Sequence, residues 1–342
     1  MTELQIVWFI LWTLLWAVYF MLDGFDLGMG TLMPFLAKNE EEKRTMYSAA
    51  GPFWDGNEVW LITAGGVTFA AFPKAYAVLF SALYAPLLIL LFALIFRAVA
   101  FEFRDKSTSP AWRSFWDCCK FLGSFLPALL LGVAFANLFK GIPIDAKGVF
   151  QGNLLTLLNP YGLLGGILFV LMFSYHGALW LAFKSSGDLH ERAVRWAKTL
   201  WIYLFAAVLL FLAATAYFTH LYDNTINSPA LAVFPLLAAV LLITSRFAKI
   251  GTFTAWIANG GFIICTTFFG VLGMFPAMVP SSLNPAFSIT AATSSNPLTL
   301  KIMLGVAAVF VPIVIVYQTV VYVIFSKKVS KEDLEEELEE EY

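Results

Sequence analysis

The chain has 342 residues, of which 60% are hydrophobic and only 13% are charged, and its formal net charge is −2. Soluble domains average about 25% charged residues, so this composition excludes an ordinary soluble protein and predicts an integral membrane protein. The near-neutral charge and the lack of a basic block give no basis for nucleic-acid binding.

Apolar segments recur along the whole chain and leave no room for a sizeable soluble domain. A membrane-spanning helix needs about 20 apolar residues, and we therefore expect an all-α integral membrane protein with nine transmembrane helices. The first segment has no basic stretch before it, so we expect a retained span and not a signal peptide. The nine segments lie near residues 4–36, 50–72, 76–101, 116–139, 160–184, 198–220, 230–246, 251–275 and 300–326.

The basic residues predict the orientation of these spans. One side of the membrane receives sixteen of the 21 Lys and Arg residues, the other side receives four, and Arg97 lies within a span. Cytoplasmic loops carry the excess of Lys and Arg, so we expect the N-terminus outside and the C-terminus in the cytoplasm. In this count Lys120 belongs to a cytoplasmic loop. The four on the outer side are Lys74, Lys140, Lys147 and Lys301.

Five charged residues stand inside three consecutive apolar segments. Asp23 and Asp26 lie in the first, Asp55 and Glu58 open the second, and Arg97 is near the end of the third. One such group facing lipid costs roughly 2.5–3.5 kcal/mol on insertion scales, so the chain must pair, hydrate or neutralise all five. In the predicted orientation they lie at a similar depth, and the i, i+3 spacing puts each pair of acids on one helix face. We expect a single polar cluster.

Two roles for this cluster are open. A structural role would pair the carboxylates with the Arg97 guanidinium and with nearby side-chain donors. Four carboxylates face one buried arginine, however, so at least two acids would stay unpaired within this chain. Unpaired acids at membrane depth protonate readily, which is typical of a proton relay, and charge counting favours the relay. The nearby donors are Trp54, Asn57 and Trp60.

Histidine and cysteine are scarce, with three of each. A buried haem needs two axial side chains, usually His or Met, and only His176 lies well inside an apolar span. We therefore do not expect this chain to hold several haems by itself, and we interpret His176 as a hydrogen-bonded buried histidine. The cysteines match neither a zinc site nor a disulfide framework, and we predict no metal site.

The pattern of spans and loops predicts four divisions of the chain. The motif Gly24-x-x-x-Gly28 predicts close contact between the first helix and a neighbour. Faint support for two related bundles comes from Trp54-Asp-Gly-Asn57 and Trp256-Ile-Ala-Asn259, which fall at corresponding places. The divisions are 1–140, a first four-helix bundle with the polar cluster; 141–280, a second four-helix bundle; 281–326, an outer loop and a peripheral ninth helix; and 327–342, an acidic cytoplasmic tail.

Several stretches along the chain carry a family resemblance. They include Leu22-Asp-Gly-Phe-Asp-Leu-Gly-Met-Gly30, Gly51-Pro-Phe-Trp-Asp-Gly-Asn-Glu-Val-Trp-Leu-Ile-Thr-Ala-Gly-Gly66, Phe96-Arg97, Phe101-Glu-Phe-Arg104, Gly132-Val-Ala-Phe-Ala-Asn137 and Leu158-Asn-Pro-Tyr-Gly-Leu-Leu164. Together they resemble subunit II of the cytochrome bd-type quinol oxidases. The resemblance extends over essentially the whole chain at the same span count.

The resemblance implies a division of labour between two subunits. Subunit I of this family carries two b-type haems and haem d and oxidises quinol near the outer face, and the complex reduces O2 to water with protons from the cytoplasm. Subunit II is the obligate partner in this heterodimer of the bacterial cytoplasmic membrane, with two four-helix bundles, a peripheral helix and no catalytic residues of its own. The family also allows a structural quinone in subunit II, a small accessory subunit, and haem b in place of haem d in subunit I.

The resemblance also implies roles for individual residues. In this family the acid of the Trp-Asp-Gly-Asn motif is assigned to a proton route toward the haems, which makes Asp55 the first candidate. Asp23, Asp26 and Glu58 are expected along the same route, although Glu58 stands where relatives can carry Gln and is not expected to be essential. The structural polar cluster is expected to comprise Arg97, Trp54, Asn57 and Trp60.

Two rival interpretations differ in what they predict. A proton-coupled secondary transporter also uses broken helices and carboxylates at mid-membrane, and it would work from this chain alone. A purely structural scaffold for subunit I would tolerate the replacement Asp55→Asn without loss of turnover.

Overall fold

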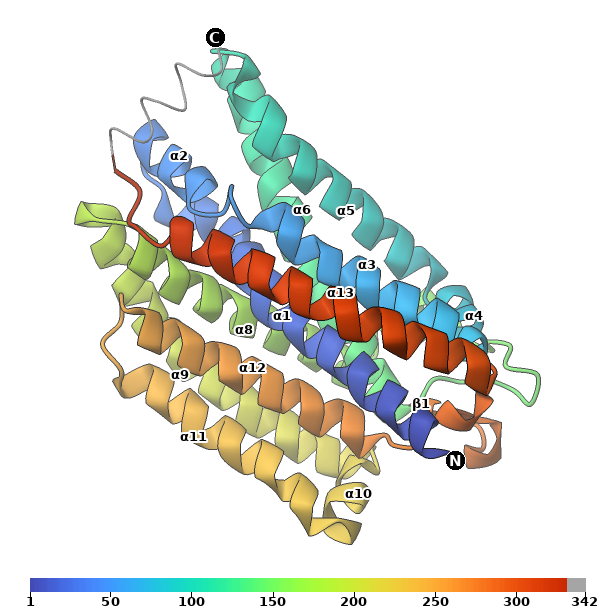
Figure 1. Ribbon diagram of the computed structural model, residues 1–342. Helices are drawn as coiled ribbons and strands as arrows, with labels where there is room; N and C mark the ends of the chain where they lie inside the picture. The colour runs from blue at the N-terminus through green and yellow to red at the C-terminus, as the bar shows by residue number, and fades with distance from the viewer. Residues whose placement is uncertain (331–342) are drawn as a thin grey trace.

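The structure, a computed structural model, describes residues 1–330 and consists almost entirely of helices (Figure 1). The last twelve residues of the expected acidic tail, 331–342, lie outside this described part. The α-helices are α1 (Glu3–Leu36), α2 (Glu40–Ser48), α3 (Trp54–Ala71), α4 (Pro73–Ala82), α5 (Tyr84–Phe103), α6 (Pro110–Lys140), α7 (Leu154–Leu157), α8 (Pro160–Lys184), α9 (Gly187–Phe218), α10 (Leu221–Asn227), α11 (Val233–Phe247), α12 (Phe253–Gly273) and α13 (Pro297–Ile324).

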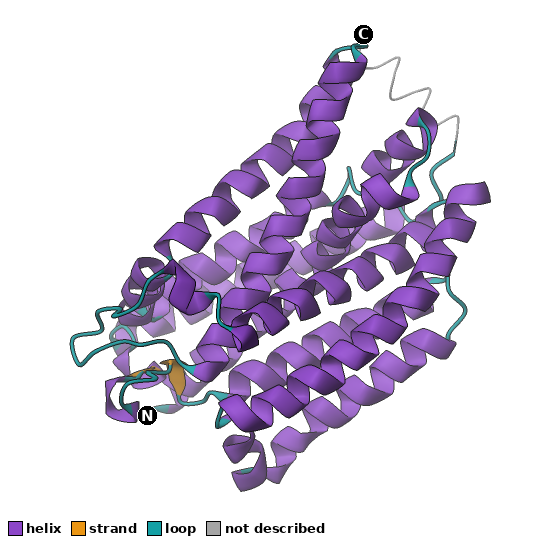
Figure 2. Ribbon diagram, turned by 180° about the vertical axis from the view of Figure 1, so that it is seen from behind, coloured by secondary structure: helices purple, strands orange, loops and turns teal. Residues whose placement is uncertain are grey.

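Short elements fill the connections between these helices. A small antiparallel hairpin joins β1 (Ala277–Val279), at the end of the expected second bundle, to β2 (Ile289–Thr290) in the expected outer loop. Figure 2 shows this hairpin beside the N-terminus, at one end of the long helices. The 3-10 helices are η1 (Arg104–Lys106), η2 (Pro229–Ala232), η3 (Pro285–Phe287) and η4 (Ala291–Thr293).

Eight helices within residues 1–330 are long and apolar enough to cross a membrane. They are α1, α5 with η1, α6, α8, α9, α11 with η2, α12 and α13. This result supports an all-α, multi-pass membrane protein. The second expected span is present as α3, but its first turns carry Asp55 and Glu58 and it is not among the eight. The count of nine, the two bundles and the orientation stay predictions.

Two boundaries differ from the expected ones for identifiable reasons. The third expected span, 76–101, is divided into α4 and α5 at Leu83, whose backbone leaves the helical region. Pro86 has no N–H to donate to the preceding turn and its ring crowds that turn, which favours the interruption at Leu83. Helix α9 begins at Gly187 and not at 198, because the charged segment expected as a loop continues the helix beyond its apolar part.

Helix α1 is the centre of the packing. It contacts α3, α6, α8 and α12, while α5 packs on α6, α9 on α8 and α11 on α12. Helix α13 lies across α1 and α3 on the outside of this assembly (Figure 1). One end of α13 is held by the Trp8 indole, whose Nε1 donates to the Leu300 carbonyl at 3.0 Å. The other end is held by Lys184, whose Nζ donates to the Phe325 carbonyl at 2.6 Å and to that of Lys327.

Helices α1 and α8 cross without side chains between their backbones. A Cβ atom at Gly28 would lie 1.7 Å from the Phe173 carbonyl oxygen, and one at Gly177 would lie 2.4 Å from the Met29 nitrogen. Only glycine allows backbones to approach this closely. A Cβ at Gly24 would likewise meet the Phe173 ring at 2.7 Å. The predicted close contact at Gly24 and Gly28 is therefore confirmed, and it fixes α1 at the level of its two aspartates.

Candidate functional site

The buried charges meet where α1, α5 and α6 pack together. Arg97 on α5 donates from both terminal nitrogens to Asp23, at 2.7 Å and 3.1 Å, and from Nη2 to Asp26 Oδ2 at 2.8 Å. The other Asp26 oxygen accepts from Lys120 Nζ of α6 at 3.2 Å. The side chains of Asp23, Asp26 and Arg97 are 0% exposed. With Glu58, described below, these residues form what we call the buried cluster.

Lys120 corrects the charge count made from the sequence. That count placed Lys120 in a cytoplasmic loop and left one buried cation for four acids, which is wrong, because Lys120 is buried in α6 and paired with Asp26. Its ammonium also lies 3.3 Å from the centre of the Phe101 ring, a cation–π contact that lowers the cost of burying the charge. The available signal was its position inside the expected span 116–139.

The three predicted donors of α3 do not bind the carboxylates. Asn57 donates to the Leu22 carbonyl at 3.0 Å, and its oxygen accepts from the Tyr322 hydroxyl. Trp60 Nε1 donates to Gln318 at 2.7 Å. Trp54 stacks on Phe101, with the ring centres 5.2 Å apart and the planes within 8°. The predicted pairing of Asn57 and Trp60 with the acids is therefore wrong, since these side chains bind α3 to α1 and α13.

The two acids of α3 occupy different surroundings. Glu58 Oε1 lies 3.5 Å from Arg97 Nη1, and the Glu58 side chain is 20% exposed, so it forms the edge of the buried cluster. Asp55 of α3 is exposed on the surface of the chain and makes no ion pair within residues 1–330. Its Oδ1 only accepts from the Gly56 nitrogen at 2.6 Å. The structure thus brings three of the four predicted acids together and leaves Asp55 on the surface of this chain.

A second group of charges surrounds the end of α5 next to α2. Arg104 is buried and pairs with Asp117 at 2.6 Å, Glu40 at 2.8 Å and Asp105 at 3.0 Å. Lys43 adds a contact to Asp117 at 2.7 Å. We call the following residues the surface ion network: Glu40, Lys43, Arg104, Asp105, Arg113 and Asp117.

Tyr47 of α2 lies between the two groups of charges. Its hydroxyl is 3.4 Å from Asp117 Oδ1, while its ring centre is 5.6 Å from Lys120 Nζ. Burial and the Asp117 charge raise the pKa of Tyr47 above its usual range.

In Glu40 burial opposes ionisation, but the hydrogen bond and charge of Arg104 outweigh it and lower the pKa of that carboxyl. Sequence patterns had not singled out this network.

His176 is a satisfied buried side chain, as the sequence predicted. Its Nε2 lies 3.0 Å from the Met21 carbonyl and its Nδ1 lies 3.1 Å from the Asn259 amide. The imidazole also stacks on the Trp256 indole, with ring centres 5.2 Å apart. Both ring nitrogens are therefore engaged within the protein, and among residues 1–330 no group of three or more His, Cys, Asp or Glu side chains is arranged to hold a metal.

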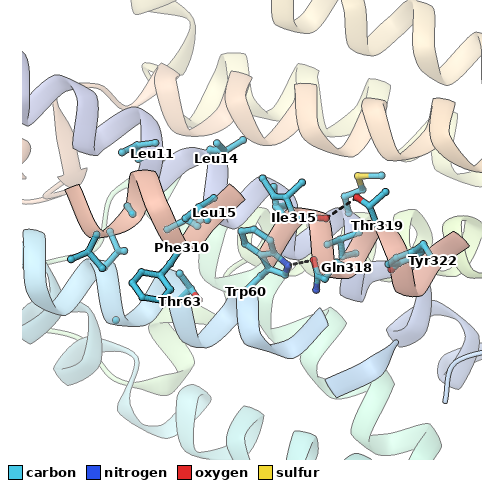
Figure 3. Close-up of a pocket in the computed structure, with 18 of the residues that line it drawn as sticks. Leu11, Leu14, Leu15, Trp60, Thr63, Phe310, Ile315, Gln318, Thr319 and Tyr322 are labelled. Carbon is cyan, nitrogen blue, oxygen red and sulfur yellow. Dashed lines mark hydrogen bonds between the residues drawn. The ribbon is translucent and has the colours of Figure 1, made fainter. Parts of the chain in front are cut away.

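An apolar pocket of about 850 Å³ lies between α1, α3, α12 and α13. Leucines of α1 line it from one side, and Phe310 and Ile315 of α13 line it from the other (Figure 3). Trp60 of α3 and Gln318 of α13 both line the pocket and are joined by a hydrogen bond. Trp256 also lines the pocket, and its buried indole nitrogen has no hydrogen-bond partner in the described chain. The pocket suits a long apolar molecule.

Comparisons with known proteins agree with the motifs. The family model described as cytochrome bd terminal oxidase subunit II matches residues 4–325. The chain is 38% identical over 338 residues to cytochrome bd ubiquinol oxidase subunit 2 of Bacillus subtilis (strain 168), which covers 97% of this chain and 99% of that protein. It is 35% identical over 369 aligned residues to cytochrome bd-I ubiquinol oxidase subunit 2 of Escherichia coli (strain K12), with 97% of each protein covered.

The fold is shared with a solved structure. A chain of the bd oxidase from Geobacillus thermodenitrificans superposes with a TM-score of 0.74 at 17% identity, over 94% of this chain and 99% of that one. The sequence matches cover nearly the whole chain, and they confirm the resemblance that its motifs suggested. This chain belongs to the cytochrome bd terminal oxidase subunit II family.

Proposed function

We propose that this chain acts as the second subunit of a respiratory oxidase that oxidises quinol and reduces O2 to water, beside a partner subunit that carries two haems b and one haem d. The proposal rests on the family and on its named relatives, which are ubiquinol oxidase subunits. It places the chain in the bacterial cytoplasmic membrane, with nine spans and a cytoplasmic C-terminus. The family match favours this function over a secondary transporter.

The specific contribution of this chain is a proton route toward the haems. The observation that carries this proposal is the row of acids leading from inside the chain to its surface. Asp23 and Asp26 are fully buried, Glu58 is partly exposed, and Asp55 stands on the outer face of α3. Acids at membrane depth that can take up and release protons are typical of proton relays. Asp55 is the proposed exit toward the partner.

The exposed face of α3 supports contact with a partner at this point. Val59, Ile62 and Phe69 are exposed on the same helix as Asp55, and Ile62 is 72% exposed. Lipid would satisfy these apolar side chains, but it would leave the Asp55 carboxylate in hydrocarbon at a cost of roughly 2.5–3.5 kcal/mol. A protein partner that supplies polar groups or water removes this cost. We therefore place the interface with the haem-bearing subunit on α3.

The apolar pocket is the proposed place for a structural quinone. Its size and apolar lining fit an isoprenoid chain, and the Trp256 ring forms part of its wall. A quinone bound there would act as a structural lipid, since the haems belong to the partner. Extraction of the purified complex and chromatography of its lipids would show a bound quinone, and a Trp256→Phe variant should retain less of it.

The first experiment on the proton route is the replacement Asp55→Asn in the purified complex. Quinol-driven O2 consumption should fall by roughly tenfold or more, because a proton donor or acceptor has been removed, while the haem content measured by reduced-minus-oxidised spectra stays normal. Asp188→Asn, an equivalent change at an exposed residue of α9, is the matched control. Unchanged turnover with full haem content would instead support a purely structural subunit.

The same spectra test the assignment of the haems. Haem bands should be present in the complex and should leave with the partner when the two chains are separated. Haem that stays with this chain would contradict the assignment. A complex without any haem, together with substrate-dependent proton flux through this chain alone, would instead support the interpretation of this chain as a secondary transporter.

A further inference from the structure

The buried cluster contains one carboxyl group more than it contains cations. Asp23, Asp26 and Glu58 supply three acids, and Arg97 and Lys120 supply two positive charges. With every group ionised, the cluster would carry a net charge of −1 inside a largely apolar region. Burying an uncompensated charge is far more costly than burying a neutral, hydrogen-bonded group. One of the three acids is therefore the natural place for a proton.

The hydrogen bonds show which two acids are already satisfied. Both oxygens of Asp23 accept from the two terminal nitrogens of Arg97. One oxygen of Asp26 accepts from Arg97 and the other from Lys120. All four aspartate oxygens thus receive a charge-assisted hydrogen bond, which is the arrangement that stabilises the ionised form.

Glu58 differs from both aspartates. Its Oε1 lies 3.5 Å from Arg97 Nη1, without hydrogen-bond geometry, and this buried oxygen has no hydrogen-bond partner in the described part of the chain. Of the three acidic side chains in the cluster, only that of Glu58 is exposed. Glu58 also belongs to α3, the helix that carries Asp55. Glu58 is the least stabilised as an anion and the best placed to exchange a proton.

We propose that Glu58 holds the exchangeable proton of the buried cluster, and that Lys120 is the positioning residue that assigns the proton to Glu58 by keeping Asp26 ionised. This inference rests on the proposed proton route and specifies its carrier. Within the proposed route, Asp23 and Asp26 stay ionised and act through their charge, and the proton that moves binds to the Glu58 carboxylate and leaves from the same group. With the proton bound, the cluster is neutral.

The surroundings of the cluster fit this assignment. The charged groups that contact Glu58 or its partners are those already named, on α1, α5 and α6. Tyr47 of α2 faces Lys120 through its ring, and Tyr19 of α1 is the other buried ionisable side chain beside Asp23. Both tyrosines are neutral at physiological pH, so neither supplies the missing charge.

Infrared spectra of the purified wild-type and variant complexes, subtracted from one another, test the location of the proton directly. The carbonyl stretching band of a protonated carboxyl group should be present in the wild-type complex and absent in Glu58→Gln. Glu191→Gln, at an exposed glutamate of α9 that is 68% exposed, should leave the band unchanged. Persistence of the band in Glu58→Gln would overturn the proposal. The measurement does not depend on turnover, so it stays informative if Asp55→Asn proves silent.

Variants of Lys120 test its positioning role. In Lys120→Met the band should shift or gain a second component, because Asp26 loses its cation and takes up a proton as well. Lys120→Arg should keep the wild-type band, and Lys198→Met, at an exposed lysine of α9, is the matched control. An unchanged band in Lys120→Met would show that Lys120 does not determine where the proton is held.

Double variants provide a second, thermal readout on the same complex. Lys120→Met should lower the unfolding temperature, and adding Asp26→Asn should restore most of the loss, because folding then no longer requires Asp26 to take up a proton. Adding Glu58→Gln should not restore it, since Glu58 is already neutral. Rescue by Glu58→Gln and not by Asp26→Asn would mean that Glu58 is ionised in the wild type, and the proposal would fail. If Lys120→Met does not assemble, the Glu58→Gln spectrum alone decides.

Discussion

The buried cluster and the surface ion network are built from the same residue types but in opposite surroundings. In the buried cluster Asp23, Asp26 and Arg97 have no exposure, and each carboxylate depends on one or two specific donors. In the surface ion network Lys43 and Glu40 are 33% and 41% exposed, and most of its members have two or more partners. Water can replace a lost partner of Lys43 or Glu40, and not one of Asp23, Asp26 or Arg97. The difference teaches that a charge deep in this protein is stable only while its balance is kept.

The replacement Arg97→Met should give the largest effect. It leaves Asp23 without both of its donors and removes one from Asp26, and loss of one partner from a buried ion pair destabilises by roughly 3–5 kcal/mol. We expect the complex to assemble poorly, with a large fall in thermal unfolding temperature and in haem recovered with the partner. Near-normal stability of Arg97→Met would show that the cluster is hydrated and would erase the contrast with the surface ion network.

Asp117→Asn should give an intermediate effect. Asp117 is shared by Arg104 and Lys43, and hydrogen bonds to charged groups contribute about 1.5–3 kcal/mol each. Arg104 keeps Glu40 and Asp105 as partners, so we expect a loss of roughly 1.5–2 kcal/mol, at the lower end of that range. Thermal unfolding of the complex measures it. A loss as large as that of Arg97→Met would mean that the network is not water-accessible in the complex.

Lys43→Ala should have a small effect that depends on salt. Exposed ion pairs contribute about 0–1 kcal/mol, and rising salt weakens surface pairs, whereas buried pairs are screened much less. The difference in unfolding temperature between Lys43→Ala and the wild type should shrink as salt is raised. The effect of Arg97→Met should stay the same, and a common salt dependence would show that both groups are in contact with solvent.

Glu40→Gln should have the smallest effect, and pH should remove it. The pKa of Glu40 is lower in the folded protein than its usual 4.5, so its ionised form stabilises the fold above that pH and the contribution is lost as the pH falls through the lowered folded value. At neutral pH the replacement should cost less than about 1 kcal/mol, because Glu40 is partly exposed to water. Unfolding measured between neutral and acidic pH should show the variant and the wild type converging, and a gap that widens in acid would reverse the sign of this argument.

The sequence predicted the acids of the site better than it predicted their partners. Acids inside apolar segments are conspicuous because hydrocarbon penalises them, so Asp23, Asp26 and Glu58 were found, and Arg97 with them. Lys120 was counted as a loop residue because lysine near the end of a span usually reaches water. Only the packing of α6 against α1 shows that its ammonium faces Asp26 and the Phe101 ring.

The fold was predictable where hydrophobic length decides it and less so where backbone detail does. The long helices follow from apolar runs, whereas the division at Leu83 depends on the position of Pro86 within one turn. The fate of Asp55 could not be predicted either. Spacing at i, i+3 placed it near Glu58, about 60° away around the helix, but only the longer glutamate side chain reaches Arg97, while Asp55 stays exposed.

The glycine crossing of α1 and α8 has a mechanical consequence for the acids beside it. Gly28 lies two residues after Asp26, and its contact with the Phe173 carbonyl leaves no room for α1 to slide or rotate against α8. Charge movement is least hindered when the surrounding dipoles are already in place and need not reorganise. Because α1 and α8 are fixed against each other at this point, side chains and water can carry protons while the helices stay still. The smallest residue in α1 thereby determines the stiffness of its most polar region.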